Sequence, residues 1–168
     1  FLALIFVLLS KVALADVNVN SIIKLDNNIP EECGLRFFFQ HNFMQTEVLV
    51  SIKKIKNKET ITQFIVNSKE SINKADIITT SSKLSEIINK KNLYKKKIFL
   101  KGKTDQDLMS FFFQELLIGG GLIIVDKSKY EIKGPIDSKV RLEYLFCTGE
   151  MFLPNYEKKN EKNYKKTN

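Results

Sequence analysis

The sequence predicts an α+β fold in which a mainly antiparallel sheet of five to seven strands is covered on one face by an amphipathic helix. Three observations support this fold class. Leucine and phenylalanine recur at helical spacing over residues 104–118. Three glycines and then an apolar run, residues 122–125, follow this helix. Short segments rich in β-branched and aromatic residues alternate with polar connections elsewhere in the chain.

The main helix is predicted over residues 104–118. Leu108, Phe112 and Leu116 recur every four residues beside a narrow polar stripe, so most of the helix circumference is expected to be covered by other parts of the chain. Gly119 is expected to end the helix, since a residue without a Cβ suits a left-handed turn. Because the glycines follow the carbonyl end of a helix, they are interpreted as a tight turn and not as a phosphate-binding loop.

The strands are predicted from aromatic and β-branched content and from alternating polarity. Residues 16–32 are interpreted as a polar arm in which Pro30 breaks any strand. A short helix is predicted over residues 82–91, because serines precede it and lysines lie in its last turn. The predicted strands are residues 35–40, 48–52, 61–66, 77–79, 98–100, 122–125 and 130–133.

Residues 138–148 carry a mixed signal. Apolar residues recur there with a period of two, which favours a final strand. A helix that begins at Asp137 or Ser138 and ends at Gly149 is the competing interpretation.

Composition divides the chain into three regions. Residues 1–15 resemble a signal peptide, with an apolar run followed by alternating alanines; a buried N-terminal strand or helix is the alternative. No initiator methionine or basic leader precedes Phe1, so the signal peptide is interpreted as truncated at its start. Residues 16–154 are predicted to form a single α+β domain, and residues 155–168 a disordered, lysine-rich tail.

The two cysteines, Cys33 and Cys147, are predicted to form a disulfide. An exported chain reaches an oxidising compartment, where two cysteines usually form a disulfide bond. A bridge that closes a loop of roughly 100 residues stabilises a fold by about 4–5 kcal/mol in the chain-entropy model. The bridge is expected to join the first core strand to the last. Two buried free thiols and a catalytic thiol are the alternatives.

The net charge of +8 comes almost entirely from lysine, since Arg36 and Arg141 are the only arginines. Arginine suits the bidentate recognition of phosphates and bases, whereas lysine is a hydrated point charge. The composition therefore predicts weak electrostatic attraction to anionic surfaces through the tail, and no specific nucleic-acid binding.

The sequence offers no catalytic set, metal site or cofactor motif. The single histidine, His41, is expected in an exposed turn, and an extended strand places it roughly 25 Å from Cys33, too far for a nucleophile and its base. One histidine and two distant cysteines disfavour zinc. The candidate ligand-binding residues are Glu115 and Glu143, as acids near apolar faces, and Tyr144.

These observations predict an exported, periplasmic or secreted, binding or assembly module without enzymatic activity, for which another envelope protein is the expected class of partner. The alternative is a small exported enzyme or small-ligand carrier with an apolar pocket between helix and sheet. A deep apolar pocket favours the alternative, and a filled core with an exposed aromatic patch favours the module.

Overall fold

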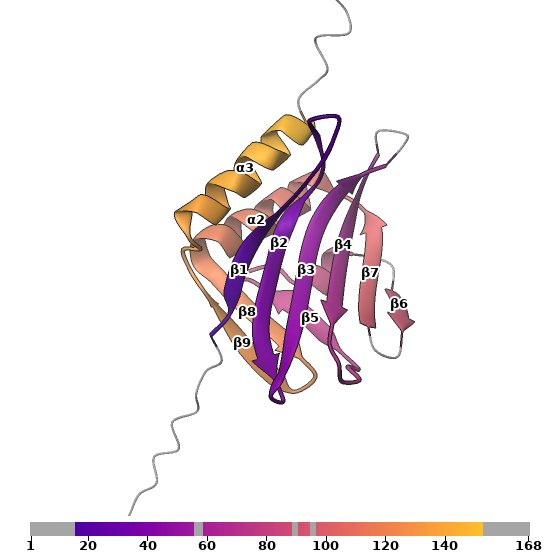
Figure 1. The fold of residues 1–168 in the computed structure, drawn as a ribbon, viewed down its shortest axis with the longest axis vertical. Helices are drawn as coiled ribbons and strands as arrows, with labels where there is room; N and C mark the ends of the chain where they lie inside the picture. Colours follow the sequence, from indigo (N-terminus) through magenta and orange to yellow (C-terminus); the bar gives the residue numbers. More distant parts are fainter. Residues whose placement is uncertain (1–15, 56–58, 89–90, 95–96, 153–168) are drawn as a thin grey trace, which may run out of the picture.

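The predicted α+β fold is confirmed in a computed structural model, which describes residues 16–55, 59–88, 91–94 and 97–152 (Figure 1). The elements in chain order are β1 (Asn18–Asp26), β2 (Ile29–His41), β3 (Met44–Lys54), β4 (Thr60–Asn67), β5 (Ala75–Ile78), α1 (Leu84–Ile87), β6 (Lys91–Tyr94), β7 (Lys97–Lys103), α2 (Gln106–Gly119), β8 (Gly120–Val125), β9 (Ser128–Lys133) and α3 (Ser138–Phe152). The strands form two antiparallel sheets. The larger has the order β1-β2-β3-β4-β7 with the short β6 beyond β7, and the smaller has the order β5-β8-β9.

One face of the larger sheet belongs to the core. Residues directly opposite each other in an antiparallel pair share a face. Phe37 is opposite Val48, and Val48 is opposite Val66; all three are fully buried. The same alternation buries the other members of this face, which are Leu35, Phe39, Val50, Ile52, Phe64, Ile98 and Leu100. Each such side chain contributes about 1.5–3 kcal/mol when fully buried, so this face is the surface on which the second layer packs.

The main helix α2 lies behind the larger sheet in Figure 1, close to the predicted limits. The carboxylate of Asp105 caps it by accepting a hydrogen bond from the N–H of Leu108 at 3.1 Å. Gly120 follows the helix with a φ of 75°, a conformation that glycine adopts readily. A Cβ at this position would lie 2.0 Å from the carbonyl oxygen of Ile132. The glycine run is therefore a helix-to-strand turn.

Residues 16–32 are not an irregular arm. They form β1 and the start of β2, joined by a turn at Asn27 and Asn28, which have φ values of 49° and 64°. Two consecutive left-handed residues are typical of two-residue hairpin turns, and asparagine tolerates this conformation. Pro30 pairs with Leu25 directly beside a register shift, where a strand tolerates proline.

The short helix α1 is one turn, Leu84–Ile87, and not the predicted residues 82–91; Lys91 already belongs to β6. The expected serine cap is also absent. The carboxylate of Asp76 on β5 accepts hydrogen bonds from the backbone N–H and the hydroxyl of Ser85, at 2.9 and 2.6 Å. The start of this helix is therefore held by a neighbouring strand.

The interpretation of residues 138–148 as a strand is wrong. They belong to α3, whose first N–H groups donate to the carboxylate of Asp137, and Gly149 lies inside this helix. The helix packs beside β1 and β2 at one edge of the larger sheet (Figure 1). Its buried residues recur at spacings of four and three, the helical period; they are Val140, Tyr144, Cys147 and Met151.

The predicted signal peptide (residues 1–15) and tail (residues 155–168) lie outside the described residues. Both stay sequence predictions. Within the described part of the chain, no helix combines the length and the apolar character needed to cross a membrane.

Candidate functional site

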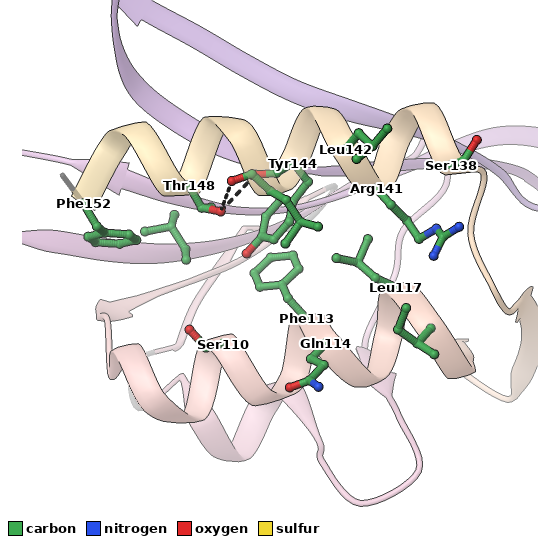
Figure 2. A pocket seen from close by; sticks show the side chains of 14 residues that line it. Ser110, Phe113, Gln114, Leu117, Ser138, Arg141, Leu142, Tyr144, Thr148 and Phe152 are labelled. Carbon is green, nitrogen blue, oxygen red and sulfur yellow. Dashed lines mark hydrogen bonds between the residues drawn. The ribbon is translucent and has the colours of Figure 1, made fainter.

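A groove with a volume of about 820 Å³ runs between α2 and α3, and we call it the α2–α3 groove. Figure 2 shows side chains of both helices pointing into the space between them. The volume lies within the range typical of small-molecule sites. The groove is lined by Ile52 of β3, by Ser110, Phe113, Gln114, Leu117 and Ile118 of α2, and by Ser138, Arg141, Leu142, Tyr144, Leu145, Thr148, Gly149 and Phe152 of α3.

The rims of the groove are apolar and exposed. On α3, Leu142 and Leu145 are 53% and 56% exposed, and on α2, Ile118 is 57% exposed. Leu108 and Phe111 of α2 are half-exposed as well, so the prediction that most of this helix is covered is wrong. Single exposed leucines are ordinary, but apolar side chains gathered along a groove mark a binding surface.

The floor of the groove is part of the core. The rings of Phe113 and Tyr144 stack with centroids 4.4 Å apart and planes at 29°. With Ile52, they are at most 4% exposed. Burial raises the pKa of the Tyr144 phenol far above its usual value. The hydroxyl therefore stays protonated, and no residue in the described part of the chain hydrogen-bonds to it.

The predicted disulfide attaches the α3 wall to the larger sheet. Cys33 on β2 and Cys147 on α3 are bonded, with Cα atoms 5.8 Å apart and exposed fractions of 0% and 3%. The bridge joins a core strand to the last helix, and not to a last strand as expected. At the end of the same helix, the ammonium of Lys54 donates to the carbonyl of Met151 at 2.5 Å. Covalent and polar contacts thus hold this wall in place.

Of the three ligand-binding residues expected from the sequence, only Tyr144 lines the groove. The carboxylate of Glu115 accepts hydrogen bonds from the hydroxyls of Ser81 and Thr79, the latter at 2.6 Å, and these lower its pKa. Glu143 accepts a hydrogen bond from the hydroxyl of a serine on β1. The structure therefore does not bring the two acids together with the tyrosine, and their role in ligand binding stays a prediction.

Arg141 is the one charged residue among the described residues that line the groove. Figure 2 shows its guanidinium extending from α3 into the space near Leu117. Its Nε is buried, and no described residue accepts a hydrogen bond from it. A buried donor without a partner is costly. In the sequence, Arg141 stands out only as one of two arginines, because its position at the groove depends on how the two helices pack.

His41 is not exposed in a turn as expected. It is 4% exposed, and its Nδ1 lies 2.5 Å from the hydroxyl of Tyr130 on β9. The turn is formed by the next two residues, Asn42 and Phe43, which both have positive φ. Because Cys33 is bonded to the other cysteine, it is not available to this histidine as a nucleophile.

Within the described residues, no group of three or more histidine, cysteine, aspartate or glutamate side chains is placed to hold a metal ion. The groove lining offers hydroxyl, amide and guanidinium groups in an apolar setting, which suits binding and orientation. In comparisons with known proteins, no family model, curated protein or solved structure matches this chain.

Proposed function

We propose that the protein is an exported binding protein without enzymatic activity that carries one small, chain-shaped apolar ligand in the α2–α3 groove. The observation behind this proposal is the groove itself. It offers about 820 Å³ of space above buried aromatic rings, between rims whose leucines are more than half exposed. This function combines two interpretations of the sequence: the non-enzymatic role that it favours, and the small-ligand carrier that is the alternative.

The volume of the groove, about 820 Å³, suits a small ligand. Sites for small molecules typically have volumes of about 300–1,000 Å³. An alkyl chain is narrow enough to reach the floor, where Phe113 and Tyr144 lie, and each methylene removed from water contributes about 0.8 kcal/mol.

The chemistry of the lining supports binding rather than catalysis. A hydroxyl nucleophile needs a neighbouring base, and the described lining residues include no histidine, cysteine or carboxylate. The hydroxyl of Thr148 donates to the backbone carbonyl of Tyr144 at 2.9 Å, so it is already used within α3.

Export is supported by the signal-like residues 1–15 and by the buried disulfide, since paired cysteines are usually oxidised only outside the cytoplasm. Expressed with its native leader, the protein should be recovered from the exported fraction with the mass of a chain that begins at Asp16 and contains one disulfide. Recovery from the cytoplasm with two reduced thiols would contradict this part of the proposal.

A neutral environment-sensitive dye such as Nile red tests the groove, with fluorescence as the readout. The wild-type chain should bind the dye saturably, and Leu145→Gln should weaken binding at least fivefold. Phe146→Gln is the matched control, because this neighbouring α3 residue is 69% exposed but does not line the groove. At such exposed positions, neither change should alter the free energy of unfolding by more than about 0.5 kcal/mol. Absence of wild-type binding, or equal effects of both variants, would refute the carrier role and favour assembly with a protein partner.

A further inference from the structure

We propose that the ligand of the α2–α3 groove is a long-chain carboxylic acid, with its carboxylate bound to Arg141 and its alkyl chain running along α3 towards Phe152. This inference rests on the proposed function, because it names the ligand class of the same groove. It is carried by an arginine that forms no ion pair with any described residue and whose described neighbours in the groove lining are uncharged and largely apolar.

Arg141 differs from the other arginine of the sequence in its surroundings. The Nε of Arg36 lies 3.2 Å from a carboxylate oxygen of Glu47, an ion pair without hydrogen-bond geometry, and its guanidinium lies 5.9 Å from the centroid of the Phe38 ring. No carboxylate of the described residues forms an ion pair with Arg141. Because a guanidinium keeps its charge at any ordinary pH, the missing counter-charge is expected from the ligand.

The two acids nearest to Arg141 in the sequence, Asp137 and Glu143, are engaged elsewhere. Asp137 accepts hydrogen bonds from the first N–H groups of the helix. Glu143 accepts a hydrogen bond from the hydroxyl of Ser21 and lies 3.9 Å from the ammonium of Lys139. Neither acid pairs with Arg141. Among the described residues, no acid therefore competes with an anion that enters the groove for the guanidinium of Arg141.

A single guanidinium among the described lining residues matches a single negative charge. A carboxylate fits best, since its two coplanar oxygens accept two parallel hydrogen bonds from the guanidinium fork. A phosphate dianion would keep one charge without a partner in this lining. The group that faces Arg141 is thus expected to be a carboxylate.

The length of the groove sets the length of the chain. From Arg141 to Phe152 the helix rises roughly 17 Å at about 1.5 Å per residue. An extended alkyl chain advances about 1.25 Å per carbon, given standard bond lengths and angles. About 13 carbons therefore fit between the guanidinium and the far end, which corresponds to tetradecanoic acid.

Displacement of the neutral dye from the full chain at pH 8 tests the inference, with tetradecanoic acid, tetradecan-1-ol and tetradecyl phosphate as competitors below their aggregation concentrations. The wild-type protein should bind the acid about ten- to a hundredfold more tightly than the alcohol. Arg141→Gln should remove this preference by weakening the acid alone. Arg36→Gln makes the same charge change outside the groove and should keep the preference.

Three outcomes would overturn the inference. Equal binding of acid and alcohol to the wild-type chain, or a preference that survives in Arg141→Gln, would remove the role of the guanidinium while the carrier function stands. Tighter, Arg141-dependent binding of the phosphate would show that the head group is not a carboxylate. Failure of both the alcohol and the acid to displace the dye would overturn the proposed function itself.

Discussion

Loss of the Cys33–Cys147 disulfide should remove a large part of the stability of the protein. The two cysteines are 114 residues apart. In the chain-entropy model, closing a loop of that length lowers the entropy of the unfolded chain by about 16 cal/mol/K, which corresponds to about 4.8 kcal/mol at 25 °C. Because measured effects are commonly about 2–4 kcal/mol, we expect a loss of about 3–5 kcal/mol. Domains have a total stability of only about 5–15 kcal/mol, so the reduced protein should be marginally stable.

The assay is unfolding in guanidinium chloride, followed by circular dichroism. The oxidised wild-type chain is compared with the same chain unfolded and refolded in reductant, because the buried bridge is not accessible to reductant in the folded state. The double variant Cys33→Ala/Cys147→Ala is a second chain that lacks the disulfide. It also removes two buried sulfur atoms, so its difference from the reduced wild type measures lost packing.

A reduced wild-type chain that unfolds with the same free energy as the oxidised chain, to within about 1 kcal/mol, would refute this reasoning. The double variant should also bind dye in the α2–α3 groove more weakly at a temperature where it remains folded. This is expected because the bridge attaches one wall of the groove to the larger sheet. Unchanged dye binding would show that packing alone positions α3.

Phe113→Ala should lower the free energy of unfolding by about 3–5 kcal/mol in a denaturant titration, because this ring is 1% exposed and stacks on a tyrosine of α3. A decrease of less than about 1 kcal/mol would contradict this packing. Gly120→Ala should destabilise by about 2–3 kcal/mol, since its φ is 75° and the new Cβ would meet backbone. Gly149→Ala is the contrasting substitution. Gly149 lies in the interior of α3 and no atom lies within 4 Å of the new Cβ, so the change should raise the free energy of unfolding by about 0.5–1 kcal/mol. Burial raises the pKa of the Glu32 carboxyl, but hydrogen bonds from Lys24 and a serine hydroxyl lower it by more. The pKa therefore lies below the ordinary value of 4.5. Its contribution to stability is therefore present above pH 4.5 and is lost as the pH falls through the lower folded pKa; unfolding measured against pH should show less acid sensitivity in Glu32→Gln than in the wild type.

The fold class, the main helix and the disulfide could be predicted because each depends on a signal that the sequence itself contains. In α2, helical spacing, an aspartate in the first turn and a glycine after the last turn all indicate the same element. The core strands over residues 35–40, 48–52 and 61–66 could be predicted because aromatic and β-branched residues are concentrated there.

The errors in β1, β2 and α1 arose where a distant partner decides the structure. Pro30 is tolerated in β2 because the neighbouring strand shifts register beside it. The first turn of α1 is capped by Asp76, nine residues before the Ser85 that it binds. Neither contact is visible in a local pattern. The paired asparagines at positions 27 and 28 were a usable signal, since two such residues favour the left-handed hairpin turn that they form.

The error at α3 arose from exposed apolar residues outside the buried face of this helix. A helix that packs on a core through one face needs apolar residues on that face alone, but α3 also carries Leu142, Leu145 and Phe152 on its groove side. The strand-like pattern arose because exposed Leu142, on the groove side, and exposed Phe146, which does not line the groove, alternate with buried Val140 and Tyr144. Sequences often depart from local rules at functional sites. The side chains of Leu142, Leu145 and Phe152 are at least 40% exposed. Burial in the core therefore does not explain why these residues are apolar, whereas a bound alkyl chain would cover them.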